Sequence, residues 1–134
     1  MPGSLFARHA GRRVTERTIG LRLEQEDGSP LCERCLLAET PLTRLKGLLG
    51  RRELPSGEGL LLRPASSIHM FFMRFPIDAV WVDKDLRVLK VSPDVAPWKV
   101  AACKGANGVV EIPAGEASRR GVAPGDQLFL RNGN

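Results

Sequence analysis

The stretch Ile68–Asp83, I-H-M-F-F-M-R-F-P-I-D-A-V-W-V-D, decides how the rest of this 134-residue chain is interpreted. It contains three of the five phenylalanines, two of the three methionines and one of the two tryptophans of the chain. A segment this apolar is expected to be buried, and ionisable groups inside it then need a partner or water. His69, Arg74 and Asp78 are such groups, so this stretch is the first place to look for a functional site.

One strand and a hairpin are predicted here. If Ile68–Phe75 is extended, its side chains alternate between two faces. His69 then shares one face with Phe71, Met73 and Phe75, and Arg74 shares the other face with Met70 and Phe72. Such a strand is expected to be covered on both sides, as in the interior of a sandwich. Ala79–Val82 and Arg87–Val91 form a hairpin around an Asp-Lys-Asp turn.

The remainder of the chain predicts short strands between turns rich in glycine and proline, together with one helix. The expected strands are residues 19–23, 31–38, 60–62, 109–113 and 127–130. Thr40 and Pro41 are typical of a helix start. Gly50 is suited to the end of this helix, whose apolar stripe is formed by Leu42, Leu45, Leu48 and Leu49.

These elements indicate a mainly β fold. We expect a single-domain β-sandwich or partly open barrel of six to eight short, mostly antiparallel strands with one short helix. Residues 18–134 are expected to form this one β-rich domain, because the chain is long enough for a single hydrophobic core. Residues 1–17 contain several arginines and little periodicity, and we interpret them as a loose basic arm.

The composition is that of an ordinary globular protein, with 43% hydrophobic and 26% charged residues. The formal net charge of +5 allows a basic surface, but no stacking aromatics lie among the arginines, so we do not expect a nucleic-acid partner. No apolar run approaches the length of a membrane span, and we expect no membrane partner. The sequence has no long apolar signal segment and contains three cysteines, so we expect a cytoplasmic protein. We also expect a monomer.

A histidine and a cysteine pair are candidates for chemistry. His69 is either a core histidine hydrogen-bonded to the backbone or a general base or orienting donor. Cys32 and Cys35 have the C-x-x-C spacing of metal and redox motifs, but no second such pair exists. We interpret them as two ordinary buried thiols, which alternation along a strand would place on opposite faces. We therefore expect no metal and no cofactor.

Arg74, Asp78 and Glu111 form the most informative charged set, because each lies within or beside an apolar segment. A buried guanidinium requires a carboxylate, and either acid can supply it. One interpretation is therefore a structural salt bridge that fixes the strand register. The other is a small polar pocket in which Arg74 holds an anionic ligand while an acid acts as base.

Two further residues are candidates for ligand contact. Arg51, just past the predicted helix, is suited to bind an anion or to interact with the negative end of the helix dipole. Trp98 lies in the long connection of residues 92–108, and loops of that length are often functional. Its side chain can either line a pocket or fill the core.

Several segments match a known pattern in order and spacing over about Leu31–Leu130. They are G-L-L-G-R at Gly47–Arg51, G-L-L-L at Gly59–Leu62, the Ile68–Asp83 stretch, V-V-E-I-P-A-G at Val109–Gly115 and G-V-A-P-G-D-Q-L at Gly121–Leu128. In these segments the chain resembles the bacterial and archaeal domain-of-unknown-function family 192. The resemblance implies a small β-rich domain and no particular activity. It places polar motif positions at Arg51, Arg74, Asp78, Glu111 and Asp126.

Three functions are compatible with these observations. The first is a non-catalytic module that binds a small ligand or a protein partner. The second is a small hydrolase or lyase, with His69 or Glu111 as base and Arg74 holding an anionic group. The third is a basic nucleic-acid accessory protein. We favour the first, with Arg51, His69, Arg74, Asp78, Trp98 and Glu111 as candidate ligand-binding residues, because no nucleophile and base are assembled in the sequence.

Overall fold

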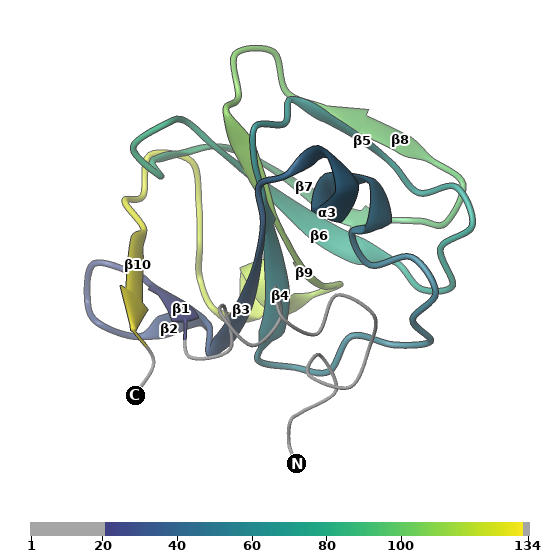
Figure 1. Cartoon of the computed structure of the whole chain (residues 1–134). Helices are drawn as coiled ribbons and strands as arrows, with labels where there is room; N and C mark the ends of the chain where they lie inside the picture. The colour runs from purple at the N-terminus through teal and green to yellow at the C-terminus, as the bar shows by residue number, and fades with distance from the viewer. Residues whose placement is uncertain (1–20, 133–134) are drawn as a thin grey trace.

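The computed structural model describes residues 21–132 of the chain (Figure 1). The predicted basic arm of residues 1–17 lies outside this range. The strands are β1 Leu21–Glu24, β2 Pro30–Cys32, β3 Arg34–Ala38, β4 Glu58–Leu62, β5 Ser67–His69, β6 Ile77–Val82, β7 Val88–Val95, β8 Val100–Ala102, β9 Gly108–Pro113 and β10 Phe129–Asn132. The helices are α3 Pro41–Lys46 and α4 Glu116–Arg119. The prediction of a mainly β fold is confirmed.

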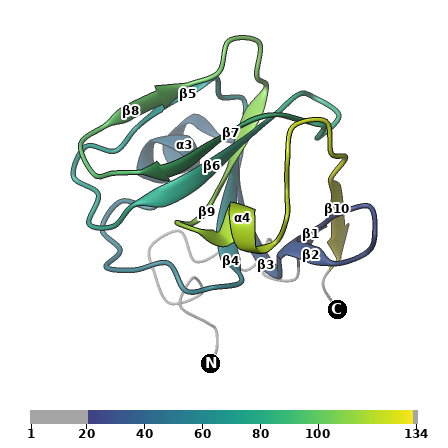
Figure 2. The same cartoon turned by 180° about the vertical axis from the view of Figure 1, so that it is seen from behind.

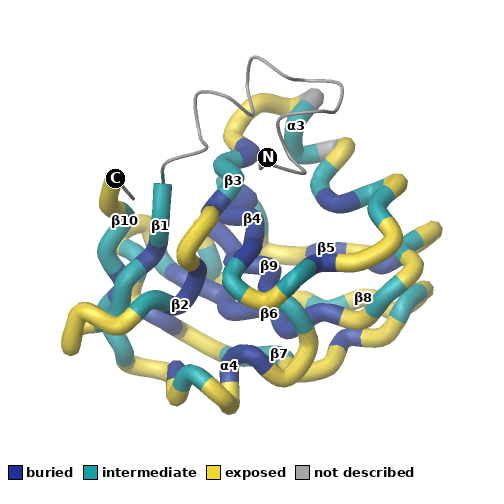
Figure 3. Tube along the Cα trace, turned by 90° about the horizontal axis from the view of Figure 1, so that it is seen from below, coloured by how far each residue is buried: buried dark blue, intermediate teal, exposed yellow. Residues whose placement is uncertain are grey.

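A five-stranded sheet in the order β3-β4-β9-β6-β7 forms the centre of the fold. Strands β3 and β4 are parallel, whereas β4, β9, β6 and β7 pair antiparallel. The β6–β7 pairing is the predicted hairpin, closed by the turn that follows Val82. Strand β9 is the middle strand of this sheet. Figure 3 shows buried residues concentrated along β4, β9 and β6, so the centre of the sheet is covered on both faces.

Each face of this sheet packs against its own apolar cluster. The first core includes Val110 and Ile112 of β9 and is covered by the β10-β1-β2 sheet and α4 (Figure 2). The second core includes Val109 of β9 and is covered by the α3 segment and the small β5-β8 sheet (Figure 1). Because side chains alternate along a strand, Glu111 falls on the face of the second core.

The strand predicted over Ile68–Phe75 is wrong beyond His69. Strand β5 ends there, and the chain turns instead of remaining extended. Phe72 adopts a left-handed backbone conformation, with φ 66°, and this interrupts the strand. Its side chain is 72% exposed, and Arg74 is also exposed, so this apolar segment is not covered on both sides.

The predicted helix begins where expected but ends earlier. Thr40 is the N-cap, and its side chain and that of Thr43 form a reciprocal capping box. The helix stops at Gly47, not at Gly50, because Gly47 adopts φ 47° and ψ −126°, which glycine tolerates best. The chain reverses there and buries Leu48 in the second core. The side chains of Leu42 and Leu45 lie outside the described part of the structure.

The strand count exceeds the predicted six to eight because two segments differ from expectation. A bend at Glu33 divides the single strand expected over residues 31–38 into β2 and β3. The long connection after Ser92 is also ordered, since it extends β7 and supplies β8. Within residues 21–132, no helix has the length and apolar character needed to cross a membrane.

Candidate functional site

Glu111 is a buried carboxyl group in the middle of the central sheet. The register places it between Leu60 of β4 and Ala79 of β6, both members of the second core. Its exposed fraction is 7%, and no hydrogen bond or ion pair links its side chain to another residue of the described range. Buried carboxyl groups in proteins are nearly always paired, so an unpaired one in an apolar cluster requires an explanation.

Glu111 lines a cavity of about 130 Å³ beneath α3 and β5. The apolar lining includes Leu48, Leu62, Ile68, Met70 and Met73, while the side chains of Arg44, Lys46 and His69 contribute polar groups. A more open hollow of about 600 Å³ shares Arg44, Leu62, Ser67 and His69 with this cavity, so the two are adjacent. Together they form a pocket whose inner part is small and contains one carboxyl group among apolar and basic residues. We call this the Glu111 pocket.

The apolar surroundings change the protonation of the carboxyl group. Burial raises the pKa of Glu111 from 4.5 to about 7, because the charged form loses its hydration and gains no partner. Near neutral pH the group is therefore present in both forms. As a carboxylic acid it can donate a hydrogen bond or a proton, and as a carboxylate it can accept one.

His69 lies at the pocket but not in the core. The residue is exposed, and its ring stacks on Phe71 with 4.7 Å between the ring centroids. The backbone N–H of Phe71 donates to Nδ1 of His69 at 3.3 Å, so the neutral ring carries its proton on Nε2. The interpretation of His69 as a buried core histidine is wrong, whereas its position in the pocket lining keeps it a candidate ligand contact.

The charged set of Arg74, Asp78 and Glu111 is not brought together. The register pairs Ala79 with Glu111 and Asp78 with Ile112, so the two acids point to opposite faces of the sheet. Arg74 is exposed on the β5–β6 loop and is not a buried salt-bridge partner. Both the salt bridge and the pocket predicted from this trio are therefore wrong.

Asp78 stabilises backbone structure instead. It is 1% exposed, and its carboxylate accepts hydrogen bonds from the backbone N–H groups of Asp94, Gly115 and Ala117 at 2.8, 3.0 and 2.9 Å. These contacts join β6 to β7 and to the turn that begins α4. Because three donors already occupy the carboxylate, its role is explained without a ligand.

Arg51 and Trp98 also differ from expectation. Arg51 is largely buried and forms an ion pair with Glu58, with 3.2 Å between Nη2 and Oε1. A carboxylate thus already contacts its guanidinium, and the end of the helix lies several residues earlier. Trp98 is 57% exposed, so it does not fill the core, and the lining of the Glu111 pocket does not include it.

Cys32 and Cys35 lie in the same core, not on opposite faces of a strand. The bend at Glu33 turns the chain between them, and both thiols are buried in the first core. The Cys35 side chain and the apolar surroundings raise the pKa of the Cys32 thiol. Within residues 21–132, no group of three or more His, Cys, Asp or Glu side chains is arranged to hold a metal ion.

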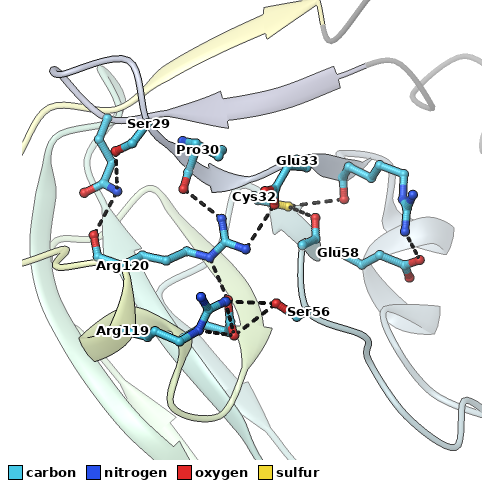
Figure 4. Close-up of polar contacts among 12 residues, drawn as sticks. Ser29, Pro30, Cys32, Glu33, Ser56, Glu58, Arg119 and Arg120 are labelled. Carbon is cyan, nitrogen blue, oxygen red and sulfur yellow. Dashed lines mark hydrogen bonds and ion pairs between the residues drawn. The ribbon is translucent and has the colours of Figure 1, made fainter.

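A second polar cluster, which sequence reasoning missed, surrounds Arg120 and Glu116 (Figure 4). Arg120 pairs with Glu116 at 2.6 Å and with Glu33 at 3.0 Å, and it donates to the backbone carbonyl of Pro30 at 2.8 Å. Hydrogen bonds and ion pairs to Arg119 and Arg120 lower the pKa of Glu116 despite its burial. The i, i+3 and i, i+4 spacing from Glu116 to the two arginines was the available sequence signal. The cluster joins α4 to the β1–β2 hairpin and to Glu33 directly after it, so its role is to stabilise the fold.

The lining of the Glu111 pocket was also missed. Arg44, Leu48 and Met70 come from three segments that are separated in sequence and meet only in the folded chain. A leucine or methionine that lines a pocket has the same periodic pattern as one that fills a core. The sequence therefore contained no signal that distinguished them.

Comparisons with known proteins place this fold in a family. A "UPF0127" protein of Thermococcus kodakarensis is 33% identical over 97 residues, which are 69% of this chain but only 61% of that relative. A crystal structure from Sinorhizobium meliloti, described as that of a candidate transcription regulator, is similar with a TM-score of 0.72 and 25% identity. That similarity covers 82% of this chain and 91% of the other.

A second solved structure, a protein of unknown function from Novosphingobium aromaticivorans, has a TM-score of 0.71 and 28% identity. It covers 81% of this chain and 82% of the other. The family model described as "Uncharacterized ACR, COG1430" matches residues 23–130. This match confirms the resemblance, and the chain belongs to the domain-of-unknown-function family 192, DUF192.

Proposed function

We propose that this protein binds a small organic ligand in the Glu111 pocket, with the Glu111 carboxyl group as the polar anchor. The observation that carries the proposal is a carboxyl group that is buried, lines a cavity and has no partner in the described range. Pockets of this kind, apolar with a few polar groups, are typical of small-molecule sites.

The energetics of Glu111 favour a functional explanation. Its cross-strand neighbours are Leu60 and Ala79, so an apolar residue would fit the same position on the sheet. The rise in its pKa from 4.5 to about 7 corresponds to about 3–4 kcal/mol lost when the group ionises in the folded protein. A ligand that donates a hydrogen bond to the carboxylate offsets this loss, and the offset contributes to binding.

The pocket also restricts the ligand. An apolar protein cavity of about 150 Å³ accommodates benzene, so the inner cavity of about 130 Å³ suits a short alkyl or aryl group. A carboxylate favours a cationic or hydrogen-bond-donating group beside that apolar body. We therefore propose a small amine, or a larger molecule that ends in an alkylamine and extends into the open hollow past Arg44.

The test uses methionine methyl groups as reporters, because Met70 and Met73 both line the cavity. In protein labelled with ¹³C at the methionine methyl groups, n-butylamine and benzylamine are titrated beside n-butanol and toluene. We expect both amines to shift the Met70 and Met73 signals, and Glu111→Gln to weaken amine binding more than toluene binding. Glu53→Gln, which removes an exposed carboxylate, is the matched control.

Two results would contradict this proposal. If none of the four compounds moves either methyl signal at millimolar concentration, the cavity does not take small ligands. If Glu111→Gln weakens binding of the amines and of toluene equally, the pocket binds apolar groups and Glu111 is not the anchor.

Proton transfer is the second candidate function, and the pKa of Glu111 supports it. A carboxyl group with a pKa of about 7 is suited to act as general acid or base at neutral pH. His69 also lines the pocket, with Nε2–H as its donor. A hydrolase or lyase of this kind predicts that Glu111→Gln abolishes turnover found in a screen of ester, amide and elimination substrates. Unchanged turnover in that variant excludes Glu111 as the base.

We also propose a cytoplasmic monomer. Cys32, Cys35 and Cys103 are all free and buried, and this supports a reducing compartment. Cell fractionation and the molar mass in solution test the two parts of this proposal separately. Recovery outside the cytoplasm or a stable dimer would contradict the corresponding part.

A further inference from the structure

Three aromatic side chains lie together on the surface where the β5–β6 loop meets the segment before β8. Phe71, Phe72 and Trp98 are 40%, 72% and 57% exposed. The ring centroids of Phe72 and Trp98 are 4.8 Å apart, and those of Phe71 and Trp98 are 5.9 Å apart. We call these three residues the aromatic tip. It belongs to the edge of the molecule formed by β5 and β8, which Figures 1 and 2 both show beside the central sheet.

The backbone fixes the aromatic tip. The N–H of Trp98 donates to the carbonyl of Met70, and the N–H of Met70 donates to the carbonyl of Lys99, both at 2.7 Å. Phe72 and Trp98 have φ of 66° and 72°, a left-handed conformation that is rare for bulky residues. Such conformations persist only where the surrounding structure enforces them, and they gather at functional sites. Here they hold two large apolar rings in contact with solvent.

The charged residues nearest the aromatic tip along the chain are basic, and the nearest exposed carboxylate is Asp94, four residues before Trp98. Residues 64–77 and 95–110, which include β5, β8 and the loops beside them, contain no aspartate or glutamate. They do contain Arg74, Lys99 and Lys104, and all three are exposed. Arg74 and Lys99 lie within two residues of the aromatic tip along the chain. This surface is therefore complementary to an anionic one.

We propose that the aromatic tip docks the protein on an anionic lipid surface, with Phe72 and Trp98 in the interfacial layer and Arg74 and Lys99 among the head groups. Exposed tryptophan and phenylalanine beside lysine and arginine are typical of side chains at a membrane interface. A single-stranded nucleic acid is disfavoured, because it needs open ring faces, whereas Trp98 stacks on Phe71 and Phe72 packs tilted against Trp98. We expected no membrane partner because no apolar run in the sequence is long enough to span a membrane, but a protein that lies on a membrane surface needs no such run.

Vesicle sedimentation tests the proposal on the full chain at low salt. We expect binding to vesicles of phosphatidylcholine with phosphatidylserine, little binding to phosphatidylcholine alone, and loss of binding as salt is added. The double variant Arg74→Gln/Lys99→Gln is expected to lower the partition coefficient about thirtyfold. Arg52→Gln/Lys84→Gln removes the same charge from exposed positions on other loops and is the matched control.

The tryptophans supply a second measurement. Trp81 is 0% exposed and Trp98 is 57% exposed, so a change of emission on binding reports Trp98. We expect a blue shift with anionic vesicles, and no shift for Trp98→Phe, which still sediments because it keeps an apolar ring. Phe72→Ser/Trp98→Ser is expected to lower the partition coefficient about tenfold, with an unchanged Tm because both side chains are exposed.

Three results would overturn the proposal. One is no sedimentation with anionic vesicles at low salt. Another is equal sedimentation of wild type and Phe72→Ser/Trp98→Ser, because the contact would then be a general electrostatic attraction. The third is a change of Trp98 emission with a single-stranded oligonucleotide but not with vesicles, since nucleic acid would then be the partner.

Discussion

Replacing Glu111 with glutamine is expected to stabilise the protein above neutral pH and to change its stability little in acid. Glutamine has nearly the same shape but cannot ionise. Burial raises the pKa of Glu111 in the folded protein from 4.5 to about 7, whereas the unfolded chain retains the ordinary value. The folded state therefore binds this proton more tightly, and the wild type loses stability as the pH rises through this interval.

The size of the effect follows from the two pKa values. The loss is complete well above pH 7 and amounts to about 3–4 kcal/mol, because the pKa values of the folded and unfolded states differ by 2.5, at about 1.4 kcal/mol per pH unit. At pH 5 about 1 kcal/mol of it is already present, and below pH 4 almost none. The advantage of Glu111→Gln over wild type should thus grow by about 2.5 kcal/mol between pH 5 and pH 8.

Urea unfolding of both proteins at a series of pH values measures this difference directly. Other titrating groups affect both proteins alike, so they cancel in the comparison. Glu26→Gln, which removes an exposed carboxylate, controls for the change in net charge. A difference between Glu111→Gln and wild type that stays constant from pH 5 to pH 8 would refute the reasoning, because Glu111 would then not be a buried unpaired carboxyl group.

Three further substitutions test other parts of the structure. Asp78→Ala should cost about 3 kcal/mol in chemical unfolding, because three buried backbone N–H groups lose their acceptor; a loss below 1 kcal/mol would mean that water replaces the carboxylate. Gly59→Ala should lower the free energy of unfolding by about 1–3 kcal/mol, because the added Cβ would lie 2.9 Å from the Cys32 Sγ and from the Glu111 carbonyl oxygen. A wild-type Tm in that variant would show that β4 and β9 can separate without cost. Arg74→Met should change stability by less than about 0.5 kcal/mol because Arg74 is exposed, and a loss of 3 kcal/mol or more would restore the buried salt bridge that the sequence suggested.

Local signals in the sequence predicted the elements that depend on local interactions. The β6–β7 hairpin follows from two β-branched runs with a turn between them, and this pairing is present. The start of α3 follows from Thr40 and Pro41. The same local reasoning placed the end of the helix at Gly50, whereas the helix ends at Gly47. Gly47 is the C-cap of α3, because glycine tolerates its backbone conformation best.

The site depended on information that lies between distant segments. Whether Asp78 and Glu111 share a face is decided by the register of β6 against β9, and a shift of one residue reverses it. The segment after His69 looked like a buried strand because it is rich in phenylalanine and methionine. Its exposure arises from the backbone conformation at Phe72 and the hydrogen bonds of Met70, which composition does not reveal.

The protonation of Glu111 itself tests the central claim most directly. A ¹³C NMR titration of the glutamate side-chain carboxyl carbons, with the Glu111 signal assigned by its absence in Glu111→Gln, gives the midpoint for this one group. The structure predicts a midpoint at about pH 7, and a shift of that midpoint to lower pH when benzylamine is added, because a cation favours the carboxylate. A midpoint near the ordinary value of 4.5 would show that the group is hydrated or paired, and would remove the basis for both proposed functions of the pocket.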